Sequence, residues 1–199
     1  ISTDYVFDGC KEGPYCETDR VSPLGVYGKS KADGEEKIRR NLKEHIIIRT
    51  SWLYGVHGNN FVKTMLNLGR EREEIKVVSD QHGCPTFAGD LAGAILDIAS
   101  RIYGGQKDSW GTYHYCGGGS TTWFGFASKI FETASRYEKF KIKKVIPIKT
   151  REYPTAATRP TNSVMDCSLM FREFNIVAPS WEQSLENMLD DLFSQKFDR

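Results

Sequence analysis

Short apolar runs alternate with helical periods along this chain of 199 residues, a pattern typical of α/β proteins. The three adjacent isoleucines at 46–48 do not alternate with polar residues and indicate a strand covered on both faces. Leu91, Ile95 and Ile98 recur at helical intervals and predict a helix with Asp90 as its N-cap. The same reasoning predicts further helices over 24–43, 60–72, 122–137 and from 181 onward, and strands within 1–7, 75–78, 112–116 and 145–148.

Two of these helices carry a clear apolar pattern. The expected buried face of the helix over 24–43 is partial and consists of Val26, Ser30, Ala32, Ile38 and Leu42. The last helix begins at a predicted capping box, in which Ser180 is followed three residues later by Gln183. Its single apolar stripe predicts a helix packed in the core and consists of Trp181, Leu185, Met188, Leu189, Leu192 and Phe193. The stretch over 150–163 is rich in Pro and Thr and is expected to be irregular.

Size and charge exclude several classes of protein. A chain of 22.6 kDa forms one domain or two small ones and buries roughly 70% of its unfolded surface without needing disulfides. Its 27 basic and 26 acidic residues nearly cancel, which argues against a nucleic-acid binder, and no apolar run approaches the roughly 20 residues of a membrane helix. Because it begins at Ile1 without a signal-peptide pattern, we expect a piece of a longer polypeptide.

The five cysteines are widely spaced and contain no C-x-x-C motif, so we expect reduced residues of a cytoplasmic protein. The four histidines lack spacing suited to zinc, and we expect no metal site of that kind. Two phosphate-loop patterns also fail. Gly28-Lys29-Ser30 ends like a Walker A motif whose first glycine is replaced by Pro23, and Gly117-Gly118-Gly119 is followed by Thr122 where G-x-G-x-x-G needs glycine. If the protein binds a dinucleotide, its main phosphate loop therefore lies outside this chain.

One pair of residues carries candidate chemistry. Tyr27 and Lys31 are four residues apart and share one face of a predicted helix. An ammonium group near a phenol favours the phenolate and so makes the phenol a better proton donor to a carbonyl. The pair follows a strand end that carries Thr3 and Asp4, and the chemistry of an open α/β sheet lies at the carboxyl ends of its strands. A Thr3 hydroxyl there can polarise the same carbonyl.

The Tyr-x-x-x-Lys interval alone is weak support, because it occurs twice more. Tyr103 and Lys107 straddle two glycines and cannot lie on a regular helix, whereas Tyr137 and Lys141 lie at a helix end rich in solvated lysines. The position of Tyr27 and Lys31 after the first strand distinguishes that pair.

Several motifs in order resemble the extended short-chain dehydrogenase/reductases. Within them the chain is most similar to the members that reduce the 4-keto group of a dTDP-linked deoxysugar with NAD(P)H. The resemblance runs nearly end to end and is carried by residues 2–9, 22–31, 49–55, 58–61 and 80–86, by Arg159-Pro160 and Ser163, and by the closing helix.

The resemblance implies part of a Rossmann-type doubly wound parallel sheet plus a smaller mixed α/β substrate-binding domain. Residues 1–52 would be the later part of the dinucleotide-binding domain and 53–199 mainly the sugar-nucleotide domain, with segments near 75–103 returning to the Rossmann sheet. It implies that Tyr27 is the proton donor, that Lys31 assists it, and that both contact the cofactor, NADPH or NADH. Thr3 would hold the keto oxygen. The implied substrate-binding residues are Thr3, Asp4, Trp52, Asn60 and Arg159.

Two alternatives stay open from the sequence. A non-catalytic NAD(P)-binding regulatory relative would keep the fold, although the retained Thr3, Tyr27 and Lys31 count against it. Another sugar-nucleotide reductase, epimerase or dehydratase is the second, but dehydratases carry a glutamate after a Thr-Asp pair where this chain has Tyr5. The choice of NADH or NADPH, bound Mg²⁺ and a homodimer are also left open.

Overall fold

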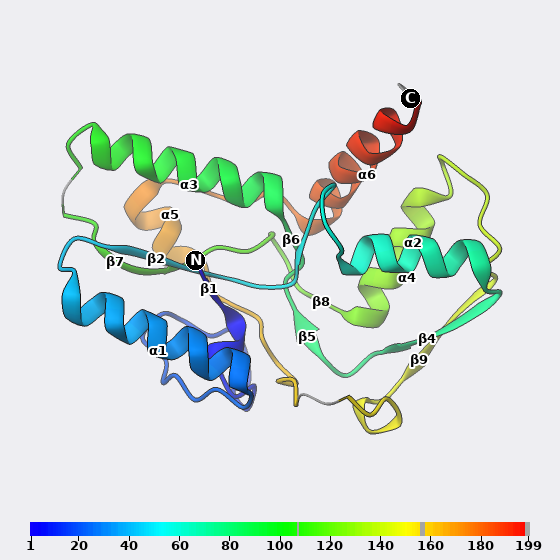
Figure 1. The fold of residues 1–199 in the computed structure, drawn as a ribbon, viewed down its shortest axis with the longest axis horizontal. Coiled ribbons are helices and arrows are strands. Elements are labelled where there is room, and N and C mark those ends of the chain that lie inside the picture. The colour runs from blue at the N-terminus through cyan, green and yellow to red at the C-terminus, as the bar shows by residue number, and fades with distance from the viewer. Residues whose placement is uncertain (107, 156–157, 198–199) are drawn as a thin grey trace.

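A three-stranded parallel sheet forms one half of the molecule. The computed structural model describes residues 1–106, 108–155 and 158–197. Strands β1 (Ser2–Thr3), β2 (Ile46–Thr50) and β7 (Gly111–His114) pair in the order β1-β2-β7, all parallel (Figure 1). Helix α1 (Val26–Asn41) lies below this sheet in Figure 1, and α3 (Ala88–Tyr103) and α5 (Ser168–Phe174) lie above it. The predicted strand over 46–48 and its cover on both faces are confirmed.

Successive residues of β2 point to opposite sides of the sheet. Ile48 belongs to a buried cluster with side chains of α3 and α5, among them Leu91 and Phe174. Arg49, the next residue, reaches the other side, where it pairs with Glu35 of α1. Because both faces of β2 are covered, its run of apolar residues needs no alternation.

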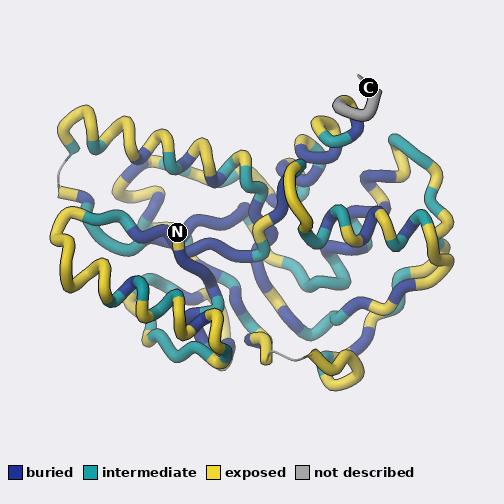
Figure 2. Tube along the Cα trace, in the orientation of Figure 1, coloured by how far each residue is buried: buried dark blue, intermediate teal, exposed yellow. Residues whose placement is uncertain are grey.

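The second half of the molecule is built on helices around a larger core. Helices α2 (Phe61–Glu71), α4 (Trp123–Ala134) and α6 (Trp181–Phe197) share this core with the parallel pair β4 (Glu74–Val78) and β9 (Lys144–Ile148), which lies at its edge (Figure 1). Leu185, Met188 and Leu189 of α6 are fully buried there, so the expected core stripe of the last helix is confirmed (Figure 2). Strand β4 therefore pairs outside the three-stranded sheet, whereas α3 and β7 lie with it.

Short elements connect the two halves. The remaining elements are the pairs β3 (Leu53–Tyr54) with β6 (Thr86–Phe87) and β5 (His82–Gly83) with β8 (Thr121–Thr122), and the 3-10 turns η1 (Asp4–Val6) and η2 (Thr150–Glu152). These pairs lie between the sheet and the helical half in Figure 1. Within the described part of the chain, no helix combines the length and apolarity needed to cross a membrane.

The expected buried face of α1 is wrong. Val26 is 85% exposed and Leu42 55% exposed, and Ser30 and Ile38 also face solvent, while Ala32 is half-buried. The helix instead buries Gly28 and Glu35. A glycine and a charged residue carry no apolar signal, so the hydrophobic pattern of this helix could not identify its inner face.

The two predicted helix caps have different outcomes. Asp90 does not cap α3, because the N-cap position is Phe87; its carboxylate instead accepts a hydrogen bond from Ser184 of α6 at 2.5 Å. Ser180 does cap α6, since its hydroxyl accepts from the backbone N–H of Gln183 at 3.2 Å. The side-chain amide of Gln183 donates to Asn187 one turn later.

Candidate functional site

The phenol of Tyr27 is exposed at the start of α1, directly above the turn that follows β1. Gly28, the next residue, makes this placement available: a Cβ there would lie 2.1 Å from the carbonyl oxygen of Tyr5, so only glycine lets the helix approach so closely. The rings of Tyr27 and Tyr5 meet edge to face with centroids 6.3 Å apart. Tyr27 nevertheless stays 59% exposed and is accessible to a substrate.

Lys31 lies one turn further along α1 and is tied to β1. Its Nζ donates a hydrogen bond to the carbonyl oxygen of Ile1 at 2.6 Å. Since α1 runs back along the sheet after β1, Tyr27 lies at the carboxyl end of the strand and Lys31 near its start. The Tyr27 ring thus contacts η1, whereas the Lys31 ammonium is bonded to the residue that precedes β1.

Thr3 and Asp4 form the buried floor beneath these residues. The Thr3 hydroxyl donates to the Asp4 carboxylate at 2.9 Å and accepts from the backbone N–H of Tyr5 at 3.2 Å, which caps η1. Burial raises the pKa of Asp4 to about 7, and hydrogen bonds from Ser163 and Thr3 offset only part of this rise. Oδ2 of Asp4 is buried and has no hydrogen-bond partner among the described residues. This carboxyl is therefore poised to change its charge near neutral pH.

Tyr5 links this floor to the segment after residue 158. Burial raises the pKa of its phenol, the Asp4 charge raises it further, and the Arg159 charge lowers it. The segment is held in place because Gly9 lacks a side chain: a Cβ at Gly9 would lie 2.5 Å from Pro160. The Thr161 hydroxyl also donates to the Gly9 carbonyl at 3.0 Å. Arg159 is therefore within electrostatic reach of the residues around Tyr27.

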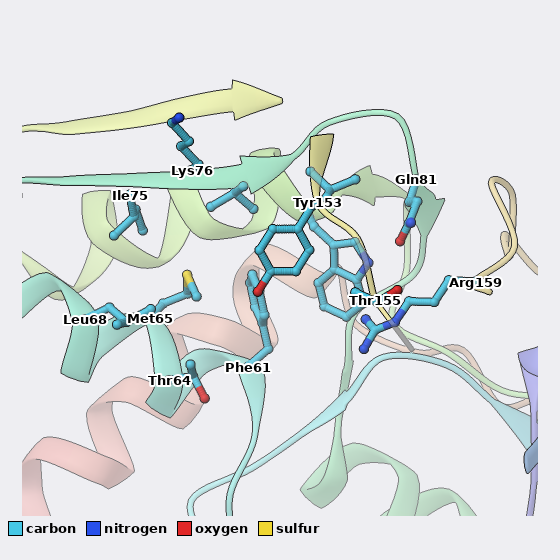
Figure 3. Close-up of a pocket in the computed structure, with 13 residues that line it drawn as sticks. Phe61, Thr64, Met65, Leu68, Ile75, Lys76, Gln81, Tyr153, Thr155 and Arg159 are labelled. Atoms are coloured by element: carbon cyan, nitrogen blue, oxygen red, sulfur yellow. The ribbon is translucent and has the colours of Figure 1, made fainter. Parts of the chain in front are cut away.

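Arg159 also lines a cavity of about 260 Å³ in the helical half of the molecule. Figure 3 shows its walls: Phe61, Thr64 and Met65 come from α2, and Tyr153 and Arg159 come from the irregular stretch after β9. The wall residues are largely apolar, and the polar members are Thr64, Lys76, Gln81, Thr155 and Arg159. A guanidinium at the edge of an apolar cavity suits a ligand that joins a flat ring to an anionic group such as a diphosphate.

A stacked pair of indoles closes this cavity. Trp52 and Trp123 lie face to face with ring centroids 3.6 Å apart and 6° between their planes. Trp123 lines the cavity and Trp52 backs it, resting on Gly83, where a Cβ would lie 2.4 Å from the Trp52 ring. Trp52 also has a left-handed backbone, with φ of 45°, that turns it out of the line of β2.

Asn60 has a complete structural role in the chain. Its Oδ1 accepts from the backbone N–H of Lys63 at 3.2 Å, capping α2, and its Nδ2 donates to the Gly55 carbonyl at 2.7 Å. The cap alone accounts for an asparagine at this position. A contact between Asn60 and substrate stays a prediction.

The other two Tyr-x-x-x-Lys intervals lie elsewhere. Tyr103 is 97% exposed at the end of α3, and Lys107 lies outside the described residues. The Tyr137 hydroxyl donates to the carboxylate of Asp190 on α6, away from β1.

Sequence reasoning missed several residues that the fold brings to these positions. Trp123, Tyr153 and Gln81 line the cavity, and Ser163 lowers the pKa of the buried Asp4. The irregular stretch over 150–163 contains no sequence pattern that identifies a cavity wall. Each is distant in sequence from the residues it joins.

Comparison with known proteins agrees with this architecture. Residues 1–194 match the model of the RmlD substrate binding domain. The chain is 44% identical over 189 residues to the dTDP-4-dehydrorhamnose reductase of Aggregatibacter actinomycetemcomitans, covering 94% of this chain and 64% of that protein. The chain thus spans about 64% of the length of such relatives.

Two solved structures are similar in fold as well as in sequence. One is the dTDP-4-dehydrorhamnose reductase of Bacillus anthracis in complex with NADP, with a TM-score of 0.84, 43% identity, and coverage of 96% of this chain and 64% of that one. The other is its counterpart from Clostridium acetobutylicum, with a TM-score of 0.86, 40% identity and the same two coverages. The predicted doubly wound α/β fold is confirmed by these likenesses. On the match over residues 1–194, this chain belongs to the RmlD substrate binding domain family.

Proposed function

We propose that this chain is the catalytic and substrate-binding part of a dTDP-4-dehydrorhamnose reductase. The reaction is the NAD(P)H-dependent reduction of the 4-keto group of dTDP-4-dehydro-L-rhamnose to dTDP-L-rhamnose, a precursor of rhamnose-containing polysaccharides. The observation that carries the proposal is the exposed Tyr27 phenol, held against Tyr5 at the carboxyl end of β1. The likeness to reductases of that name over 94% of the chain supports it.

In the proposed reaction, Tyr27 gives its hydroxyl proton to the keto oxygen of the sugar. Lys31, one turn away on α1, supplies a positive charge that stabilises the phenolate left behind. Thr3 lies at the end of β1, and its hydroxyl would turn from Asp4 to the keto oxygen when substrate binds. Protonation of the Asp4 carboxylate weakens the hydrogen bond that it accepts from the Thr3 hydroxyl. With a pKa of about 7, Asp4 can be protonated near neutral pH, which would help Thr3 to turn to the substrate.

The cavity beside Arg159 is the proposed nucleotide site. Its apolar wall, closed by Trp123 with Trp52 behind it, accommodates a flat base, and Arg159 is placed to pair with the diphosphate. In this proposal Asp4 acts on the substrate indirectly, by positioning Thr3, and Trp52 acts indirectly, by supporting Trp123.

The residues of this chain suit one end of the cofactor. When bound, NADPH supplies the hydride. The exposed Tyr27 and the Lys31 ammonium provide hydroxyl and amine donors for the ribose next to the nicotinamide. The diphosphate of the cofactor needs a glycine-rich loop that this sequence does not contain.

We propose that the two binding functions belong to different parts of the chain. Residues 1–52, with α3 and β7, belong to the dinucleotide-binding half, and the rest belongs mainly to the sugar-nucleotide half. We also expect the enzyme to be cytoplasmic. We expect it to form a homodimer, which analytical sedimentation would test.

The test is made on the full-length protein that carries this chain. Oxidation of NADPH is followed with dTDP-4-dehydro-L-rhamnose as substrate. Tyr27→Phe is expected to lower kcat by about 100-fold or more, because general acid catalysis contributes about 10²- to 10⁴-fold, while KM changes little.

Tyr103→Phe is the matched control, because it removes the same hydroxyl from a tyrosine that is 97% exposed. It should leave kcat and KM unchanged. Turnover by Tyr27→Phe within about threefold of the parent protein would remove Tyr27 from the mechanism. NADPH oxidation that does not depend on the keto sugar would contradict the proposed function itself.

A further inference from the structure

Three of the five cysteines gather behind the carboxyl ends of the parallel strands. Cys116 follows β7, and its Sγ lies 3.5 Å from the Sγ of Cys167, the residue before α5. Cys84 is the third member of this group, and the neighbouring Cys116 thiol lowers the pKa of Cys84. All three are free thiols in the structure. Cys116 is thus the shared neighbour of two thiols that are distant from it in sequence.

These thiols are accessible through a cavity. Cys84, Cys116 and Cys167 line a cavity of about 510 Å³, whose other walls include Gly118, Met170 and Val177. Cys116 and Cys84 are buried, whereas Cys167 is half-buried. A small oxidant that enters the cavity therefore meets Cys167 as the more exposed thiol, with Cys116 directly behind it.

We propose that Cys116 and Cys167 are a reversible redox pair, which hydrogen peroxide converts to an intramolecular disulfide. In the first step the Cys167 sulfur attacks the peroxide; an S–O bond forms, the O–O bond breaks, and water leaves, giving a sulfenic acid. In the second step the Cys116 sulfur displaces the hydroxyl group as a second water, and the S–S bond forms. Two thiols lose two electrons, and one molecule of hydrogen peroxide gains them.

The geometry suits this bond. The two sulfurs are already in contact at 3.5 Å and need to approach by about 1.5 Å to reach a bond length of about 2.0 Å. The hydrogen bonds with Cys167 and Cys84, together with burial, raise the pKa of Cys116. The raised pKa keeps Cys116 in the less reactive thiol form, so we assign the first reaction with peroxide to Cys167 and not to Cys116.

The disulfide would fix a segment that reaches the candidate active site. Met165 pairs with Tyr15 as an isolated bridge, and Ser163 is near enough to the buried Asp4 to lower the pKa of its carboxyl. Joining Cys167 to Cys116 ties the end of this segment to the end of β7. Oxidation would then restrict the movement of the floor that Thr3 and Asp4 form.

Peptide mapping of the 199-residue chain tests the proposal. Each cysteine lies in its own tryptic peptide: Cys116 in 108–129, Cys167 in 152–172, Cys84 in 77–101, Cys10 in 1–11 and Cys16 in 12–20. The reduced chain is treated with hydrogen peroxide, its remaining thiols are alkylated, and it is digested without reductant. The expected product joins 108–129 to 152–172, with two hydrogens fewer than the separate peptides, and dithiothreitol releases it.

Cys10 is exposed and reports the oxidant dose. At the dose that removes half of the Cys10 thiol, more than half of the two peptides should be joined. Cys167→Ser should abolish this product, and Cys84→Ser, the matched change at the other neighbour of Cys116, should retain it. Full alkylation of Cys116 and Cys167 at that dose would overturn the proposal, as would a predominant link between any other two peptides.

Discussion

The ion pair between Glu35 and Arg49 fixes α1 to the sheet, and its loss should be costly. Arg49 donates from Nε and Nη2 to the two carboxylate oxygens of Glu35 at 2.9 and 2.7 Å, a bidentate arrangement. Both side chains are only 2% exposed. Glu35→Gln keeps the shape of the side chain but removes its charge, so the buried guanidinium loses its counter-ion.

The magnitude follows from this burial. Removing one partner of a buried ion pair costs about 3–5 kcal/mol of unfolding free energy, because the other charge is left uncompensated. For a chain of this size that corresponds to a fall in Tm of about 6–20 °C. Glu36→Gln is the matched control on the same helix. Glu36 pairs with Arg40 at 2.7 Å but its side chain is 47% exposed, so its loss should cost below about 1 kcal/mol.

Urea unfolding of the chain, followed by circular dichroism, measures both variants. Burial acts to raise the pKa of Glu35, but the hydrogen bonds and the charge of Arg49 outweigh it, so that the pKa is lowered below its ordinary 4.5. A carboxyl with a lowered pKa in the folded state stabilises the fold above pH 4.5 and loses this effect as the pH falls further. The difference in unfolding free energy between Glu35→Gln and the parent should therefore become smaller below pH 4.5. Equal stability losses for Glu35→Gln and Glu36→Gln would refute the reasoning.

Two further substitutions test the surroundings of Tyr27. Gly28→Ala should destabilise the chain by about 1–3 kcal/mol, since the added Cβ meets the Tyr5 carbonyl at 2.1 Å. Gly34→Ala on the same helix, where a Cβ meets no described heavy atom within 4 Å, should stabilise it by up to about 1 kcal/mol; thermal unfolding that gives both changes the same sign would contradict this. Asp4→Asn should stabilise the chain more at pH 8 than at pH 4, by up to roughly 4 kcal/mol, because the folded pKa of about 7 lies above the ordinary 3.8 and stability is lost as the pH rises between these values. A benefit from Asp4→Asn that is equal at both pH values in urea unfolding would exclude ionisation of Asp4 as its cause.

Elements with a strong local pattern could be predicted from the sequence. The buried strand β2 and the apolar stripe of α6 can each be identified from residues that are close together in the sequence. Tyr27 and Lys31 could be singled out because their spacing on one helix is also local. For such features the sequence neighbourhood and the spatial neighbourhood coincide.

The inner face of α1 and the wall of the cavity could not be predicted. Glu35 can be buried because it forms an ion pair with Arg49 on strand β2. An analysis of hydrophobic periodicity does not detect an ion pair. Trp52 is paired with Trp123, about seventy positions later, and Arg159 reaches Tyr5 through a segment that has no regular structure. These contacts depend on topology, which no local window contains.

The pairing of the strands has a consequence for how fast the chain can fold. Ser2 pairs with Arg49, Ile46 with Gly111, and Glu74 with Lys144, so the partners in each parallel ladder are roughly fifty to seventy positions apart. Parallel neighbours cannot be joined by a hairpin, and each ladder must close a long loop before its hydrogen bonds form. Barriers of this entropic kind slow folding far more than they lower final stability. On a ribosome, the first strand would therefore emerge well before its partner and wait for it.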